Sequence, residues 1–126
     1  MNMPARNFRD LRAWQAAYSL TLEIYRVTAG FPKDEIFGLT SQIRRAAISV
    51  TSNIAEGFGR RGRKEKDNFY SIAHGSLTEV DNQLMIAKGV GYLSDDVYQK
   101  IDDMVIQSHR LLYGLRKANQ EKGAGE

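Results

Sequence analysis

The stretch IFGLTSQIRRAAISVTSNIA, which runs from Ile36 to Ala55, contains the repeating pattern that decides the fold. Its apolar side chains recur every three or four residues, which is the spacing of one face of an α-helix. They are Ile36, Leu39, Ile43, Ala46, Val50 and Ile54. The chain has only two prolines, Pro4 and Pro32, so no proline interrupts a helix after residue 32. The sequence therefore predicts a long helix that ends at the glycines within 57–62.

Three other segments show the same spacing on either side of this stretch. The first ends near Pro32, and its apolar stripe is Leu11, Trp14, Tyr18, Leu22 and Tyr25. The next starts at about Lys64 and stops at the glycines 89 and 91, with the stripe Phe69, Ala73, Leu77, Val80, Leu84 and Ala87. The last has Ser94 as its predicted N-cap and the stripe Val97, Ile101, Met104, Val105, Ser108, Leu111 and Leu115.

Four amphipathic helices with short connections and no convincing strand predict an all-α fold, an antiparallel up-down-up-down four-helix bundle. A length of 126 residues suits one domain, which we assign to residues 1–116. The polar, glycine-containing segment 117–126 is expected to be a flexible C-terminal tail. Charges interrupt the first thirty residues, so we expect neither a signal peptide nor a membrane span. The absence of cysteine suits a cytoplasmic protein.

The Ile36–Ala55 helix has too few charges for a helix that faces water on its outer side. Its only charged residues are Arg44 and Arg45, whereas a surface helix normally has a charged face opposite its apolar stripe. If Ile43 points into the bundle, Ile48 points nearly the other way. The helix is either covered by its own neighbours or forms a subunit interface. Because each helix of a four-helix bundle retains an outer face, we favour the interface and expect a homo-oligomer.

No pattern of catalytic or metal-binding residues is recognisable. Di-iron bundle enzymes need Glu-x-x-His pairs, which this chain lacks, and His74 and His109 lie on different predicted helices. The glycines within 57–62 match neither a Walker nor a dinucleotide motif. We therefore predict no enzyme activity, no metal and no cofactor. The acids Glu56 and Glu79 are expected to pair with Arg44 or Arg45, although a ligand-binding role stays open.

The stretch FGRRGRKEK, Phe58 to Lys66, carries a charge of +4, whereas the rest of the chain sums to −1. Basic residues are mildly unfavourable at the start of a helix, so helix stability does not explain them. Arginines beside the free amides of a helix start do suit phosphate. The candidate nucleic-acid-binding residues are Arg60, Arg61, Arg63, Lys64 and Lys66. The competing interpretation is a solubilising turn, and an oligomer that repeats the turn would strengthen the nucleic-acid reading.

From Phe8 to about Leu115 the chain resembles a bacterial four-helix-bundle family associated with intervening sequences of the large-subunit ribosomal RNA gene, sometimes labelled S23. The most specific motifs are Leu39-Thr40, Gln42–Ala46, Ser52–Gly57, and Ala73 with Gly75-Ser76 and Glu79. The resemblance implies a ring, commonly a homopentamer. The chain is also similar to the accessory protein of diversity-generating retroelements, a basic barrel that binds nucleic acid and partners a reverse transcriptase. The family's signature residues here are Arg44, Arg45, Asn53, Glu56 and Glu79, and their role in the interface or in ligand binding stays open.

The charge distribution and the resemblance together predict a non-enzymatic, cytoplasmic, ring-forming helical bundle that binds RNA or DNA mainly through phosphate contacts. Most of the attraction is assigned to Arg60, Arg61, Arg63 and Lys64. The alternative is a protein-interaction scaffold that has a polypeptide partner and no nucleic-acid role. No feature of the sequence names the nucleic acid or the partner.

Overall fold

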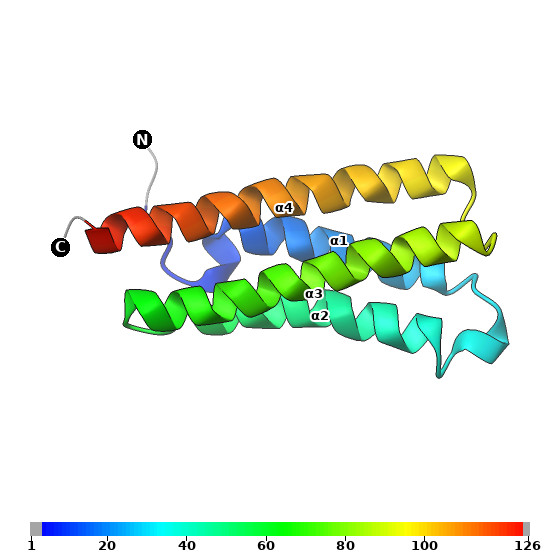
Figure 1. Cartoon of the computed structure of the whole chain (residues 1–126), viewed down its shortest axis with the longest axis horizontal. Helices are drawn as coiled ribbons and strands as arrows, with labels where there is room; N and C mark the ends of the chain where they lie inside the picture. The colour runs from blue at the N-terminus through cyan, green and yellow to red at the C-terminus, as the bar shows by residue number, and fades with distance from the viewer. Residues whose placement is uncertain (1–3, 125–126) are drawn as a thin grey trace.

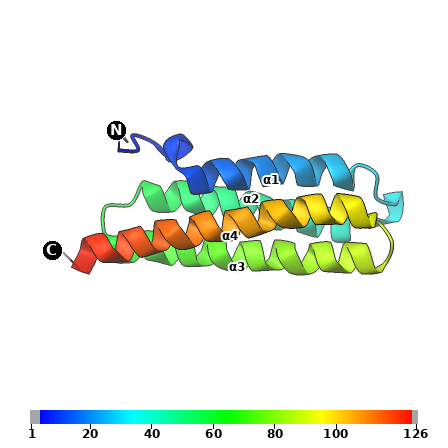
Figure 2. The same cartoon turned by 90° about the horizontal axis from the view of Figure 1, so that it is seen from above.

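The structure, a computed structural model, describes residues 4–124. Its four α-helices are α1 (Arg12–Thr28), α2 (Leu39–Phe58), α3 (Arg63–Gly89) and α4 (Asp95–Ala124). Two short 3-10 turns precede α1 and α2, at Phe8–Asp10 and Lys33–Glu35. No strand occurs within residues 4–124. The helices lie side by side and form one elongated body (Figures 1 and 2).

The helix ends and the connections between helices lie at the two ends of this body. The start of α1, the α2–α3 turn and the last turns of α4 lie at one end, on the left in Figure 1. The α1–α2 and α3–α4 connections lie at the other end. The basic stretch and the C-terminal part of the chain therefore come together, although they are far apart in the sequence. No helix within residues 4–124 is both long and apolar enough to span a membrane.

Every helix contributes fully buried side chains to a single core. Burial of these groups is the main force that holds the helices together. The largest buried side chains are Leu20 and Ile24 of α1, Ile43 and Ile54 of α2, Tyr70, Leu77 and Leu84 of α3, and Ile101 and Leu112 of α4. The predicted inward face of α3 is therefore confirmed, and so is that of α2 from Leu39 onward. The prediction that Ile36 belongs to this face is wrong, because Ile36 lies before the helix and is 56% exposed.

The stripe predicted to face inward from α1 is right for Leu11 and Trp14, which pack against the core, but wrong for Tyr18, Leu22 and Tyr25. Tyr18 and Leu22 are 46% and 52% exposed. The helix instead buries Ala13, Ala17, Leu20, Ile24 and Thr28. Two apolar stripes run along this helix, and the one with the smaller side chains faces the core, because alanines let neighbouring helices approach closely. Tyr18, Leu22 and Tyr25 are left on the outside.

Helix α2 begins at Leu39, three residues later than the pattern predicts. Gly38 has φ −113° and ψ −117°, which is not helical. The Oε1 atom of Glu35 accepts a hydrogen bond from the backbone N–H of Leu39 at 3.3 Å and so caps the helix start. Phe37 is consequently outside the helix and is 94% exposed.

The N-cap predicted at the start of α4 is confirmed, because Ser94 Oγ accepts a hydrogen bond from the N–H of Val97 at 3.2 Å. Tyr98, and not Val97, is the first buried residue of this helix. The helix does not end at residue 116 but continues to Ala124. No proline interrupts 117–122, so the helix has no reason to stop there. Residues 125–126 of the predicted tail lie outside the described residues.

Candidate nucleic-acid interface

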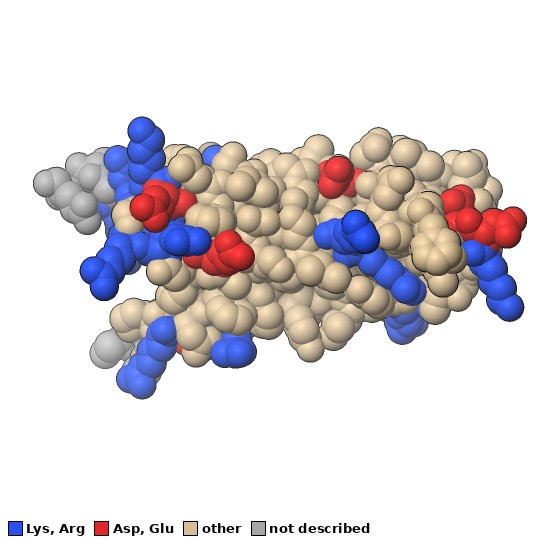
Figure 3. All heavy atoms as spheres, turned by 90° about the horizontal axis from the view of Figure 1, so that it is seen from below, with Lys and Arg blue, Asp and Glu red and all other residues tan. Residues whose placement is uncertain are grey.

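The basic stretch forms the tight turn between α2 and α3. Helix α2 ends at Phe58 and α3 begins at Arg63. Arg60, Arg61, Arg63 and Lys64 are all exposed. In the space-filling view, lysine and arginine side chains gather at this end of the molecule, whereas the middle of the same face is largely uncharged (Figure 3). The turn therefore presents its positive charge to solvent.

Lys66 differs from the other four basic residues because it is half-buried and has backbone partners. Its Nζ donates to the carbonyl oxygen of Phe58 at 2.6 Å and lies 3.5 Å from that of Gly57. These carbonyls belong to the last turn of α2, which lacks intrahelical donors for them. A positive charge is also favourable at this end of a helix. Lys66 therefore caps α2, a role that the charge pattern alone did not reveal.

Two further contacts hold the turn in place. The guanidinium carbon of Arg60 lies 4.6 Å from the centroid of the Phe69 ring, a cation–π arrangement. The side-chain amide of Asn119 on α4 donates to the carbonyl oxygen of Arg63 at 3.0 Å. These contacts fix the direction of the basic residues and link the turn to α4.

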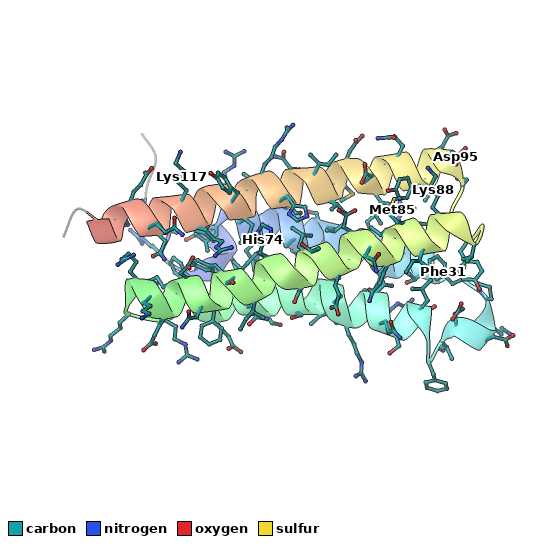
Figure 4. All side chains as sticks on the ribbon, viewed as in Figure 1. Phe31, His74, Met85, Lys88, Asp95 and Lys117 are labelled. Carbon is teal, nitrogen blue, oxygen red and sulfur yellow. The ribbon has the colours of Figure 1, made fainter. Side chains whose placement is uncertain are left out.

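Helix α4 brings additional cations to this end, and sequence reasoning missed them because it treated residues 117–126 as a flexible tail. Lys117 and Lys122 are exposed on the last turns of α4, and Figure 4 shows Lys117 projecting outward at the end occupied by the α2–α3 turn. Arg116 pairs with Asp67 of α3 through an Nε–Oδ1 distance of 3.1 Å. A continuous helical pattern through 111–122 was the signal that could have placed these lysines at the same end of the bundle as the basic turn.

We call six residues the basic end: Arg60, Arg61, Arg63, Lys64, Lys117 and Lys122. None of them forms a salt bridge with a carboxylate within residues 4–124. Ordinary surface lysines and arginines often lie beside acids, which cancel their field at a distance. The basic end therefore keeps an excess of positive charge, which Glu65 in the first turn of α3 and Glu121 of α4 offset in part, whereas Asp67 is already occupied by Arg116.

A second surface lies along the outer side of α1 and α2. We call Tyr18, Leu22 and Tyr25 of α1 together with Ile48 of α2 the α1–α2 face; all four are exposed. The two helices are joined there by Arg44, whose Nε donates to Thr28 Oγ1 at 2.9 Å and whose guanidinium carbon lies 4.6 Å from the Tyr25 ring centroid. Ile48 follows Arg44 by one helical turn. An apolar and aromatic surface of this kind suits contact with another protein surface.

The signature residues do not form the expected pairs. Neither Arg44 nor Arg45 forms a salt bridge with Glu56 or Glu79 within the described residues. Asn53 instead donates to the carbonyl oxygen of Ser49 at 2.8 Å. Ser49 Oγ in turn lies 2.8 Å from Ser76 Oγ, across the contact between α2 and α3.

Arg45 and Glu79 line a surface groove of about 380 Å³ between α2 and α3, and Glu56 is exposed. Arg44 thus links α2 to α1, whereas Asn53 bonds within α2 to Ser49, whose hydroxyl contacts Ser76 of α3. The other three signature residues, Arg45, Glu56 and Glu79, are exposed.

The histidines are adjacent, which the sequence did not predict. The rings of His74 on α3 and His109 on α4 have centroids 5.2 Å apart in an edge-to-face arrangement. Burial and the neighbouring His74 lower the pKa of His109, and the charge of Asp81 partly opposes them. No group of three or more metal-ligating side chains occurs within residues 4–124. The pair therefore belongs to the α3–α4 packing.

Comparisons with known proteins agree with the four-helix fold. A family model described as 23S rRNA-intervening sequence protein matches residues 9–114. A crystal structure of a protein of unknown function from the S23 ribosomal protein family of Bacteroides thetaiotaomicron is similar, with 20% sequence identity and a TM-score of 0.77. The similarity covers 83% of this chain and 95% of that one, and it supports the fold alone. A comparison with curated proteins finds no match.

Proposed function

The chain belongs to the family of 23S rRNA-intervening sequence proteins, and on that premise we propose that it is a non-enzymatic, ring-forming protein that binds RNA or DNA mainly through phosphate groups. The observation that carries this proposal is the basic end, where the α2–α3 turn and the last turns of α4 place six cations without a carboxylate partner in the described residues. Phosphate contacts of this kind position a nucleic acid without reading its sequence.

The local geometry supports phosphate binding by the turn. The first backbone N–H groups of α3 have no intrahelical acceptor and point toward the turn. Arg61, Arg63 and Lys64 surround them and are exposed. Free amides and guanidinium groups together make a good environment for an anion. No side chain caps these amides at Gly62, so a phosphate oxygen could accept from them.

The ring follows from the α1–α2 face. We propose that each protomer is an antiparallel up-down-up-down bundle and that its exposed Tyr18, Leu22 and Ile48 pack against a neighbouring copy. A contact between different faces of identical subunits closes into a ring when the rotation permits it. A pentamer is what the family resemblance implies. Each ring would repeat the basic end around its axis, so the positive fields would add and affinity for a polyanion would rise.

The experiment is fluorescence anisotropy with short labelled RNA and DNA. The test variant replaces Arg61, Arg63 and Lys64 by alanine, and the control variant replaces Lys33, Lys88 and Lys100. Both lose three charges, but the control residues lie at the opposite end of the bundle. We expect the test variant to bind at least about tenfold more weakly and the control to bind like the wild type. If both variants bound the nucleic acid equally weakly, the loss of affinity would follow from net charge alone. That result would contradict a binding site at the basic end.

A second candidate is a protein-interaction scaffold, and the exposed Phe37 favours it. This side chain is 94% exposed on the α1–α2 connection, and an isolated aromatic group presented to water suits an apolar pocket of a polypeptide partner. The connection is held by Glu35, whose Oε2 accepts from Tyr92 Oη at 2.9 Å. Wild-type protein that binds neither RNA nor DNA in the anisotropy experiment would favour this candidate.

A further inference from the structure

A pocket of about 260 Å³ lies beside the basic turn, between residues 4–11, the end of α2, α3 and α4. Its walls are mostly apolar. They are formed by Pro4, Ala5, Leu11, Phe58, Tyr70, Leu115 and Ala118, and the polar groups are Lys66, Asn119 and Lys122. The pocket therefore combines an apolar interior with two cations, Lys122 of the basic end and Lys66, and the phosphate contacts proposed above leave its apolar walls unused.

The apolar part is rigid and neutral. Tyr70 is only 2% exposed, and burial raises its pKa to about 12, so the phenol stays protonated. Phe58 is half-buried at the end of α2, and the ammonium group of Lys66 lies 5.2 Å from its ring centroid. A volume of about 260 Å³ is slightly below the range of roughly 300–1,000 Å³ for drug-sized ligands. The pocket thus suits a single planar ring system.

Both lysines line the pocket. Burial lowers the pKa of Lys66, and the positive charge of Lys122 lowers it further. Neither ammonium group forms a salt bridge with a carboxylate in the described part of the chain. An anion placed beside both would remove their repulsion, and the apolar walls next to them would strengthen that attraction by excluding water.

We propose that this pocket takes an unpaired nucleobase, with the adjoining phosphate held by Lys122 and Lys66. The proposal rests on the proposed function, because it names which form of nucleic acid the basic end prefers: a strand whose bases are free to leave the stack. Bases stack on aromatic and apolar side chains with little dependence on their identity. The shared chemistry is a nucleoside phosphate, which could be part of a strand or a free nucleotide.

The experiment compares three labelled ligands of similar charge: a ten-nucleotide thymidine strand, an abasic strand of the same length, and a fully paired hairpin. If the pocket holds a base, the wild type binds the thymidine strand at least about fivefold more tightly than the abasic strand. The Ala118→Trp variant fills the pocket from an exposed position on α4 and should bind both strands equally. Ala29→Trp, at an exposed position beyond the end of α1 at the opposite end, should keep the wild-type preference.

If the wild type bound the thymidine and abasic strands equally tightly, the proposal that the pocket holds a base would be wrong. The proposed phosphate contacts of the basic end would not be affected by this result. Wild-type protein that binds none of the three ligands would instead overturn the proposed function. Thymidine monophosphate that displaces the labelled strand would assign the same pocket to a free nucleotide. A preference for the thymidine strand without such competition would assign it to a base within a strand. A circular dichroism melt of each tryptophan variant confirms that it is folded.

Discussion

Lys66 Nζ lies 2.6 Å from the carbonyl oxygen of Phe58, so a lysine from the first turn of α3 closes the last turn of α2. This contact makes the basic turn a structural element as well as a charged one. It also distinguishes Lys66 from its basic neighbours, because part of its three-donor ammonium group is already used by backbone acceptors of α2 and the remainder is left for a phosphate in the pocket. The five basic residues of the turn therefore divide into one capping lysine and four cations exposed to solvent.

Lys66→Met should lower the free energy of unfolding by about 1 kcal/mol, because the last carbonyls of α2 lose a charged donor. Methionine retains most of the apolar stem. Urea denaturation measures the change, and Lys64→Met, at an exposed position two residues earlier, should stay within about 0.5 kcal/mol of the wild type. Identical stabilities of the two variants would show that the cap contributes nothing.

Two glycines should respond in opposite directions when each is replaced by alanine. A Cβ atom at Gly57 would lie 2.7 Å from Cε1 of the buried Tyr70 and 3.0 Å from Cβ of Phe69, so Gly57→Ala should destabilise the protein by about 1–3 kcal/mol. A Cβ atom at Gly75 would meet nothing within 4 Å. Gly75→Ala should therefore stabilise α3 by roughly 0.5–1 kcal/mol through helix propensity. Thermal melts that rank the two variants in the reverse order would contradict the close α2–α3 packing.

Acidification should weaken the fold through His109. Burial and the adjacent His74 lower its pKa from the ordinary value of 6.5, so below that value the unfolded chain binds a proton that the folded chain resists. Stability is therefore complete above pH 6.5, falls as the pH drops below it, and levels off under the folded-state pKa. His109→Gln should make the urea midpoint less dependent on pH across this window. A midpoint that varies with pH as steeply in the variant would assign the effect to other groups.

Subunit association should depend on the α1–α2 face. Ile48 and Ile106 are similarly exposed, at 43% and 42%, but Ile106 lies on α4. Ile48→Glu should dissociate the oligomer into a species of about the chain mass of 14.2 kDa, because a charge would be buried in the contact. Ile106→Glu should leave the mass unchanged. Light scattering at micromolar concentration measures the mass of each variant. A wild type that is already monomeric would contradict both the proposed interface and the ring.

The helices could be predicted because the spacing of their apolar residues and several of their end signals can be recognised within a short stretch of sequence. The stripes of α2 and α3 and the serine cap of α4 need only neighbouring residues to be recognised. The face of α1 could not be predicted, since both of its sides are apolar and the tight fit of Ala13 and Ala17 against other helices decides which one is buried. The start of α2 likewise depends on the side chain of Glu35 and on Gly38.

The positive charge of the basic turn could be predicted from the sequence, but the different roles of its five basic residues could not. Capping by Lys66 and stacking of Arg60 on Phe69 depend on the exact path of the turn. Lys117 and Lys122 join the basic end only because α4 is long enough to reach it. The pocket beside Lys66 is lined by residues from four separate segments of the chain, and no local sequence pattern predicts that these segments lie together.

The most direct test of phosphate binding is the salt dependence of the affinity for a ten-nucleotide single strand. The logarithm of the association constant should fall linearly with the logarithm of the salt concentration, and the slope counts the phosphates that are neutralised. We predict that the Arg61/Arg63/Lys64→Ala variant has a slope shallower than the wild type by about 2, the value for three lost contacts to a single strand. A wild-type affinity that does not change with salt, or an unchanged slope in the variant, would contradict the account.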